Sequence, residues 1–115
     1  MVLAGHVHNY QRFTKHHAGK KTPYVVAGAG GYHNLHSVVR INGERIVPPL
    51  TKTIDGDNIT LERYLDDRHG FLRLVIGDPI VLGKYYSVPR PQEAWSAPSK
   101  LVDLFRFNWR THQFA

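Results

Sequence analysis

A short apolar run that ends in a glycine and two histidines constrains this chain more than any other stretch. Residues 2–4 (Val-Leu-Ala) lead directly into Gly5, and His6 and His8 follow with one residue between them. This pattern predicts a buried strand that presents side chains at the mouth of a sheet. In extended backbone, residues two apart leave the chain on the same side, so both imidazoles would point together. Imidazole suits Zn, Fe, Cu and Ni, and the pair therefore predicts half of a transition-metal site.

The following residues extend this pair into a longer block. Residues 5–12 read Gly-His-Val-His-Asn-Tyr-Gln-Arg. This block resembles the last signature block of the calcineurin-like metallophosphoesterases, most closely in the purple-acid-phosphatase branch, which typically reads Gly-His-x-His-x-Tyr-Glu-Arg. The chain departs from that pattern at Gln11, so an ion pair made by the family's glutamate is not expected here. A Gly-Ala-Gly-Gly run at 28–31 and a bulky terminal strand also resemble the family, but only residues 5–12 are specific.

The resemblance implies a fold, a metal centre and a reaction. The chain would be mostly β, as the carboxyl-terminal part of a two-sheet αββα sandwich, and residues 1–115 would be a segment of an incomplete metallophosphoesterase domain. His6 would bind one metal and His8 the other, each through one neutral ring nitrogen. The centre would hold two divalent or trivalent ions of Fe, Zn or Mn and would hydrolyse a phosphorylated substrate.

Four further residues are candidates for supporting this centre or for lying beside the substrate: Asn9, Tyr10, Arg12 and His33. Tyr10 and Arg12 are interpreted as supporting or packing residues in preference to catalytic ones. His33 and His36 have the spacing of a helical pair, but the glycines before them argue against a helix. We therefore expect both at the rim of the site. No catalytic residue is assigned, since the resemblance implies a general acid upstream of residue 1.

Hydrolysis by two metals needs ligands that these residues do not supply. Such centres hold two cations about 3.5–4 Å apart, and several carboxylates offset their charge. In the family, the acidic blocks precede the histidine block, so they are expected upstream. Residues 56–58 (Gly-Asp-Asn) resemble one of them, but they come after the histidines and have Thr60 where the family carries Asp or Tyr. The 115 residues alone are therefore predicted to be inactive, and exposed strand edges predict self-association.

The remaining chain predicts strands and turns. Strands are expected at 24–27, 37–41, 44–47, 72–76, 80–88 and 105–109. Asn42-Gly43 predicts a hairpin turn, residues 77–79 predict another, and the glycines at 28–31 predict a tight turn near the metals. Residues 13–21 are interpreted as a polar loop or hairpin tip. Residues 50–68 show no clear periodicity, with one helical turn possible at 61–65. Trp95 and the stripe of Phe105, Phe107 and Trp109 are expected in the core.

Composition leaves one alternative open. The chain has 115 residues, no cysteine and a formal net charge of +6. Histidine and carboxylate must therefore supply any metal ligands, and no apolar run is long enough to cross a membrane. The positive charge fits a missing acidic segment better than a nucleic-acid partner. A basic, β-rich nucleic-acid-binding or interaction module without catalysis remains the alternative function, although no nucleic-acid signature is present. The compartment is left undecided.

Overall fold

The computed structural model describes residues 1–94 and 96–115, and these residues form strands and loops without a helix. No membrane-crossing helix therefore occurs among them. The first sheet has the strand order β1-β3-β2-β5-β4. Its strands are β1 (Val2–Ala4), β2 (Tyr10–His17), β3 (Lys20–Ala27), β4 (Leu50–Ile54) and β5 (Asp57–Leu65). The second sheet has the order β6-β7-β8-β9. Its strands are β6 (Gly70–Ile76), β7 (Ile80–Ser87), β8 (Lys100–Asn108) and β9 (Gln113–Phe114).

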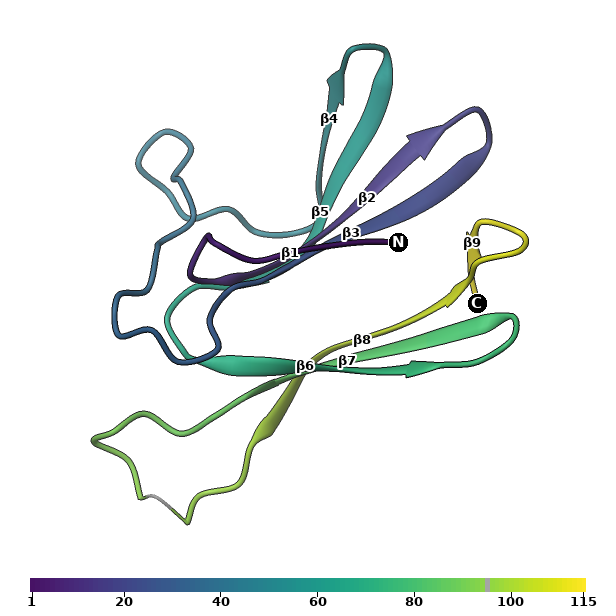
Figure 1. The fold of residues 1–115 in the computed structure, drawn as a ribbon. Helices are drawn as coiled ribbons and strands as arrows, with labels where there is room; N and C mark the ends of the chain where they lie inside the picture. The colour runs from purple at the N-terminus through teal and green to yellow at the C-terminus, as the bar shows by residue number, and fades with distance from the viewer. Residues whose placement is uncertain (95) are drawn as a thin grey trace.

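The two sheets form two layers with the core between them. In Figure 1 the first sheet is the upper layer, and β6, β7 and β8 form the lower layer. The core comprises Tyr10, Val25, Tyr85, Phe105 and Phe107. Each layer contributes side chains that alternate along its strands, as expected for sheets that are buried on one face. The prediction of a mostly β chain is confirmed, as is the burial of Phe105 and Phe107.

Tight turns connect most neighbouring strands. Every pairing is antiparallel except that of β1, which lies parallel to β3 at the sheet edge. The predicted turn between β6 and β7 at residues 77–79 is confirmed. Residues 13–21 are mostly strand, not loop, because only Ala18 and Gly19 turn, with φ of 48° and 75°. The remaining residues of that segment belong to β2 and β3.

The prediction for residues 50–68 is wrong. Residues 61–65 lie in β5, which pairs with β4 around a turn at Asp55 and Gly56, both at positive φ. Asp-Gly favours such a turn as Asn-Gly does. The threonines of β4 weaken the alternation of apolar and polar residues that predicts a strand. Thr51 and Thr53 lie on the same side of β4 and form hydrogen bonds with Thr60 and Asn58 of β5.

The Asn42-Gly43 turn forms, but its predicted strands at 37–41 and 44–47 do not. The only ladder contact in this segment, within the part of the chain described, is an isolated bridge between Ile41 and Glu44. The segment has no neighbouring strand to pair with and instead lies against the first sheet, where Asp66 accepts hydrogen bonds from the Val38 N–H and the Arg45 guanidinium. Trp95 lies outside the described residues.

Trp109 is not in the core. It follows the end of β8 and is 42% exposed, so the apolar stripe that begins at Phe105 stops at Phe107. Its indole N–H donates to the carbonyl of Gly77 at 3.1 Å, and its ring lies beside the Arg110 guanidinium. The alternation of aromatic and polar residues continues to Trp109 in the sequence, but strand β8 ends at Asn108.

Candidate metal centre

The chain turns twice between β1 and β2, at the two histidines. Val7 donates its N–H to the carbonyl of Gly5 at 2.9 Å, and Asn9 donates its N–H to the carbonyl of Val7 at 2.8 Å. His6 and His8 are therefore the central residues of two successive three-residue turns. The prediction that both histidines lie just past the end of β1 is confirmed. The prediction that this strand is buried is wrong, because β1 lies at the edge of the first sheet and all three of its residues are exposed. The extended backbone assumed between the two histidines is wrong, because these hydrogen bonds bend the chain at each histidine.

His6 occupies a backbone conformation that side chains avoid. Its φ is 70°, close to the value of the rare, strained γ-turn. A non-glycine residue in this region costs about 1–2 kcal/mol. Such strain persists only where the surrounding structure imposes it, and it clusters at functional sites. The side chain of His6 is exposed, so packing does not explain why histidine stands here.

Gly28 allows the turn of His6 and His8 to sit against the end of β3. Its N–H donates to the carbonyl of Asn9 at 3.1 Å. A Cβ at this position would collide with the backbone carbonyl of Val7. Two backbones therefore pass closely at Gly28, as the interpretation of this run as a close approach beside the histidines requires.

The ring of His8 is oriented by the segment at 34–36. Its Nδ1 lies 2.6 Å from the carbonyl oxygen of Asn34. A carbonyl only accepts, so Nδ1 carries the proton and donates it. In the neutral ring, Nε2 is then unprotonated and has a free lone pair. A metal-binding histidine usually donates its other ring N–H in this way, which fixes the tautomer and raises the basicity of the ligand nitrogen.

His36 holds the backbone of His8 from the other side. The His8 N–H donates to Nδ1 of His36 at 3.1 Å, and the His36 N–H donates to the carbonyl of His8 at 3.0 Å. The two rings are stacked with centroids 4.4 Å apart. Tyr32 packs on His8 at 4.7 Å. Because His36 uses Nδ1 as an acceptor, its neutral ring carries the proton on Nε2, and His36 is a support and not a ligand in this arrangement.

Asn9 and Gln11 complete the support beneath the histidines. Asn9 is buried, and its amide donates to the carbonyl of His36 at 2.8 Å. Gln11 donates its amide to the Oδ1 of Asn9 at 2.9 Å. A glutamate at position 11 would have no N–H to donate to Asn9, so this contact requires the amide of Gln11. Asn9 therefore connects β2 to the loop that orients His8.

Tyr10 and Arg12 face away from the histidines and connect the two sheets. The Tyr10 hydroxyl donates to Oδ2 of Asp103 at 2.7 Å, and Arg12 donates to both carboxylate oxygens of Asp103 at 2.7 and 3.0 Å. The Tyr10 ring stacks on Tyr85 with centroids 3.8 Å apart. Burial, followed by the charge of Asp103, raises the pKa of Tyr10 above its usual value, and burial raises the pKa of Tyr85 to about 12. Both side chains therefore take part in the packing of the two layers, in line with their interpretation as supporting or packing residues.

His33 is brought near the histidine turn but not into it. It is exposed, and its ring stacks on Tyr32 at 4.7 Å. His69 reaches the same loop, where its Nε2 donates to the carbonyl of Tyr32 at 2.7 Å. Among the described residues, no three histidine, aspartate or glutamate side chains gather into a metal-binding group. A metal held by His6 and His8 would therefore need ligands from beyond the described residues.

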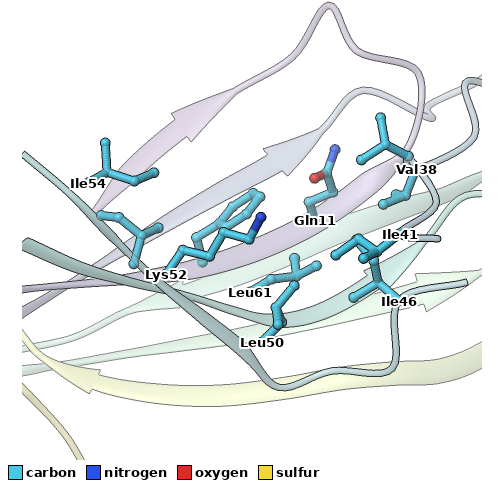
Figure 2. Close-up of a pocket in the computed structure, with 11 residues that line it drawn as sticks. Gln11, Val38, Ile41, Ile46, Leu50, Lys52, Ile54 and Leu61 are labelled. Atoms are coloured by element: carbon cyan, nitrogen blue, oxygen red, sulfur yellow. The ribbon is translucent and has the colours of Figure 1, made fainter.

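An apolar cavity lies elsewhere, on the outer face of the first sheet. It has a volume of about 250 Å³ and lies between the 38–46 segment and strands β2, β4 and β5. Figure 2 shows aliphatic side chains around it, with Lys52 and Gln11 as polar groups. Its lining residues are Gln11, Phe13, Val38, Val39, Ile41, Ile46, Leu50, Lys52, Ile54, Ile59 and Leu61. It contains no acid, base or nucleophile for catalysis besides the single lysine.

The sequence missed the residues that support His8. Asn34 acts through its backbone carbonyl, which every residue has, so no sequence signal could have identified it. His36 was expected at the rim, and its role as an acceptor depends on a fold that brings residues 8 and 36 together.

Comparison of the chain with protein-family models, with curated proteins and with solved structures finds no match.

Proposed function

We propose that this chain contributes His6 and His8 as ligands to a two-metal centre that hydrolyses phosphoesters. In this proposal the chain is the carboxyl-terminal part of a metallophosphoesterase sandwich with helices on its outer faces. The observation that carries the proposal is the His8 ring, whose Nδ1 donates to the Asn34 carbonyl and whose Nε2 is left with a free lone pair. The strained backbone of the neighbouring His6 supports it.

The chain's own residues have limited roles in this chemistry. When bound, the two ions would polarise the phosphoryl oxygens and lower the pKa of a bound water. His6 and His8 would hold Fe or Zn through imidazole nitrogen, which suits both metals, whereas Mn would depend more on the oxygen ligands of the centre. Asn34 and His36 orient His8, and Arg12 pairs with Asp103 and is given no role in binding phosphate in this proposal. The carboxylate ligands and the general acid would come from outside residues 1–115.

The proposal is tested on the natural polypeptide that contains these residues. His6→Ala and His8→Ala should each lower the metal content and the turnover of a chromogenic phosphate monoester, because each removes a ligand. The fold should survive, since neither side chain belongs to the core. His16→Ala and His17→Ala are matched controls on β2 and should leave both measurements near the parent value. Full metal content and activity in either ligand variant would contradict the proposal.

The 115 residues by themselves should not hydrolyse phosphoesters. Two imidazoles leave a divalent ion largely water-coordinated, without a carboxylate to balance its charge. The chain is assayed with a phosphate monoester and a diester in excess Zn, Mn or Fe. Metal-dependent turnover that disappears in a His6→Ala/His8→Ala double variant would show that the chain holds more of the centre than we propose.

One observation favours the alternative of nucleic-acid binding. Arg73, Lys84 and Arg106 lie on the outer face of the second sheet, and none of them takes part in an ion pair of the described residues. Phe71 and Tyr86 stack beside them with centroids 5.3 Å apart. Cations and aromatic rings on a sheet suit single-stranded nucleic acid. Binding of a mixed oligonucleotide that weakens steeply between about 50 and 200 mM salt would support this alternative.

A further inference from the structure

Strand β6 is a long, apolar sheet edge. It lies at the border of the second sheet, and among the described residues its one partner strand is β7 (Figure 1). Its sequence, Gly-Phe-Leu-Arg-Leu-Val-Ile, contains a single charge at Arg73 and no proline. Edge strands of this composition present unpaired N–H and C=O groups that recruit another chain. By comparison, β1 has three residues and β4 carries Lys52 at its centre, so both offer a poorer edge.

The direction of the free backbone groups on β6 follows from its two ends. Gly70 donates its N–H away from β7, to the carbonyl of Ala29 at 3.0 Å. Gly77 donates its N–H toward β7, to the carbonyl of Ile80 at 2.9 Å. Backbone groups alternate in direction along a strand, so Leu72, Leu74 and Ile76 point the same way as Gly70. Within the described chain, these three residues have no hydrogen-bond partner on that side.

The side chains of β6 also divide between two faces. Leu72 and Leu74 pack against the core between the sheets. Phe71 and Val75 are half-exposed on the outer face, with Arg73 between them. Ile76 is on the core side but is 75% exposed, because the layer above does not reach it. A strand added at this edge would therefore cover Ile76 as well as the free backbone groups.

We propose that β6 pairs antiparallel with β6 of a second copy of this chain, in the register that places Leu74 opposite Leu74. Leu72 then lies opposite Ile76 of the second copy, and Ile76 opposite its Leu72. All three residues with free backbone groups become hydrogen-bonded pairs across a two-fold axis. The two second sheets join into one continuous sheet, and Ile76 is buried against Leu72 of the other copy.

Charge favours this register over its neighbours. On the outer face it sets Arg73 opposite Val75 of the second copy, so the two arginines are not opposed. A register centred on Arg73 would place the two guanidinium groups directly opposite each other, which is destabilising. A register centred on Leu72 would pair Leu74 with Gly70, whose N–H is already bound to Ala29. Of these three registers, only the one centred on Leu74 pairs the free backbone groups of Leu72, Leu74 and Ile76 without placing two arginines opposite each other.

A charge placed at Val75 tests both the surface and the register. Val75→Glu sets a carboxylate opposite Arg73 of the second copy, and Val75→Lys sets a cation there. Both new contacts occur twice in the dimer. Cross-strand charge pairs contribute about 0.2–1 kcal/mol each, so the two contacts should change the dimer dissociation constant by about 2- to 30-fold. Val75→Glu should tighten the dimer, Val75→Lys should weaken it, and Arg73→Glu/Val75→Lys should restore it.

The measurement is light scattering after size-exclusion chromatography of the 115-residue chain over a range of concentrations. Val47→Glu and Val47→Lys make the same changes in net charge at a position that is 84% exposed and distant in sequence from β6. They should leave the dissociation constant unchanged. Circular dichroism checks that each variant retains its β content, which is expected because Val75 is half-exposed. A monomer at every concentration, or equal effects at Val75 and Val47, would overturn the proposal.

Hydrogen exchange locates the contact independently of the variants. The amides of Leu72, Leu74 and Ile76 should gain protection as the concentration rises, because their N–H groups become donors in the dimer. Concentration-dependent protection in β4 or β1 instead would show association through another edge and overturn the assignment. The inference does not depend on metal binding, so its outcome is separate from that of the proposed function.

Discussion

Replacing Asp103 by alanine should strongly destabilise the fold, because this buried residue of β8 joins the two layers. Its carboxylate is 8% exposed and accepts hydrogen bonds from Tyr10 and from both ends of the Arg12 fork. Without it, the Arg12 guanidinium, whose side chain is 13% exposed, is left buried and unpaired. Breaking one partner of a buried ion pair costs about 3–5 kcal/mol, a large part of the roughly 5–15 kcal/mol that stabilises a typical domain.

The assay is urea unfolding followed by circular dichroism. With a slope of about 1–3 kcal/mol per molar urea, a loss of about 3–5 kcal/mol should lower the urea midpoint by about 1–5 M. The triple variant Tyr10→Phe/Arg12→Met/Asp103→Leu should be much closer to the parent, since replacing a whole buried network by apolar groups is often neutral. Asp67→Ala breaks the exposed pair with Arg90 and should cost less than about 1 kcal/mol. The reasoning fails if the triple variant is as unstable as Asp103→Ala alone.

Three further outcomes are expected. His6→Gly should stabilise the fold by about 1 kcal/mol, because it relieves the positive φ, while weakening Zn binding; urea unfolding and metal titration read the two effects, and a loss of stability would contradict the strain. Gly28→Ala should cost more than about 1 kcal/mol because its Cβ meets the carbonyl of Val7, whereas Gly30→Ala, which enters open space, should cost much less. Burial raises the pKa of Asp66, but its hydrogen bonds to Arg45 and Val38 outweigh burial and lower the pKa below its usual value. The ionised carboxylate therefore stabilises the fold fully above about pH 3.9, and this stabilisation is lost as the pH falls through the folded-state pKa. Asp66→Asn should remove this part of the acid sensitivity, as measured by unfolding at several pH values.

The sequence predicted the elements whose signals are local. The apolar run before Gly5 and the turn at 77–79 needed no knowledge of distant residues, and both are present. The segment at 37–47 was over-interpreted, since its Asn-Gly turn forms but a strand also needs a neighbour to pair with. The β4–β5 hairpin was missed because Thr51 and Thr53 weaken the contrast between its two faces, although Asp55-Gly56 carried the turn signal.

One block of sequence was enough to predict where the two candidate ligands lie relative to β1. His6 and His8 lie where the motif places them, but the turn geometry that bends the chain at each histidine depends on Gly28, far along the sequence. Tyr10 was classed as a supporting or packing residue, and the structure gives the reason in its contact with Asp103. That contact joins residues at opposite ends of the chain, which no spacing rule could connect.

The state of the His8 ring in solution tests the central claim most directly. Long-range ¹H–¹⁵N correlation spectra distinguish the two ring nitrogens of each histidine and report which one responds to metal. The proposed role predicts a neutral His8 protonated on Nδ1, with Nε2 shifting when Zn²⁺ is added and His6 responding at the same concentrations. His16 and His17 should not respond in this range. A His8 ring protonated on Nε2, or a Zn²⁺ response confined to the other histidines, would contradict the claim.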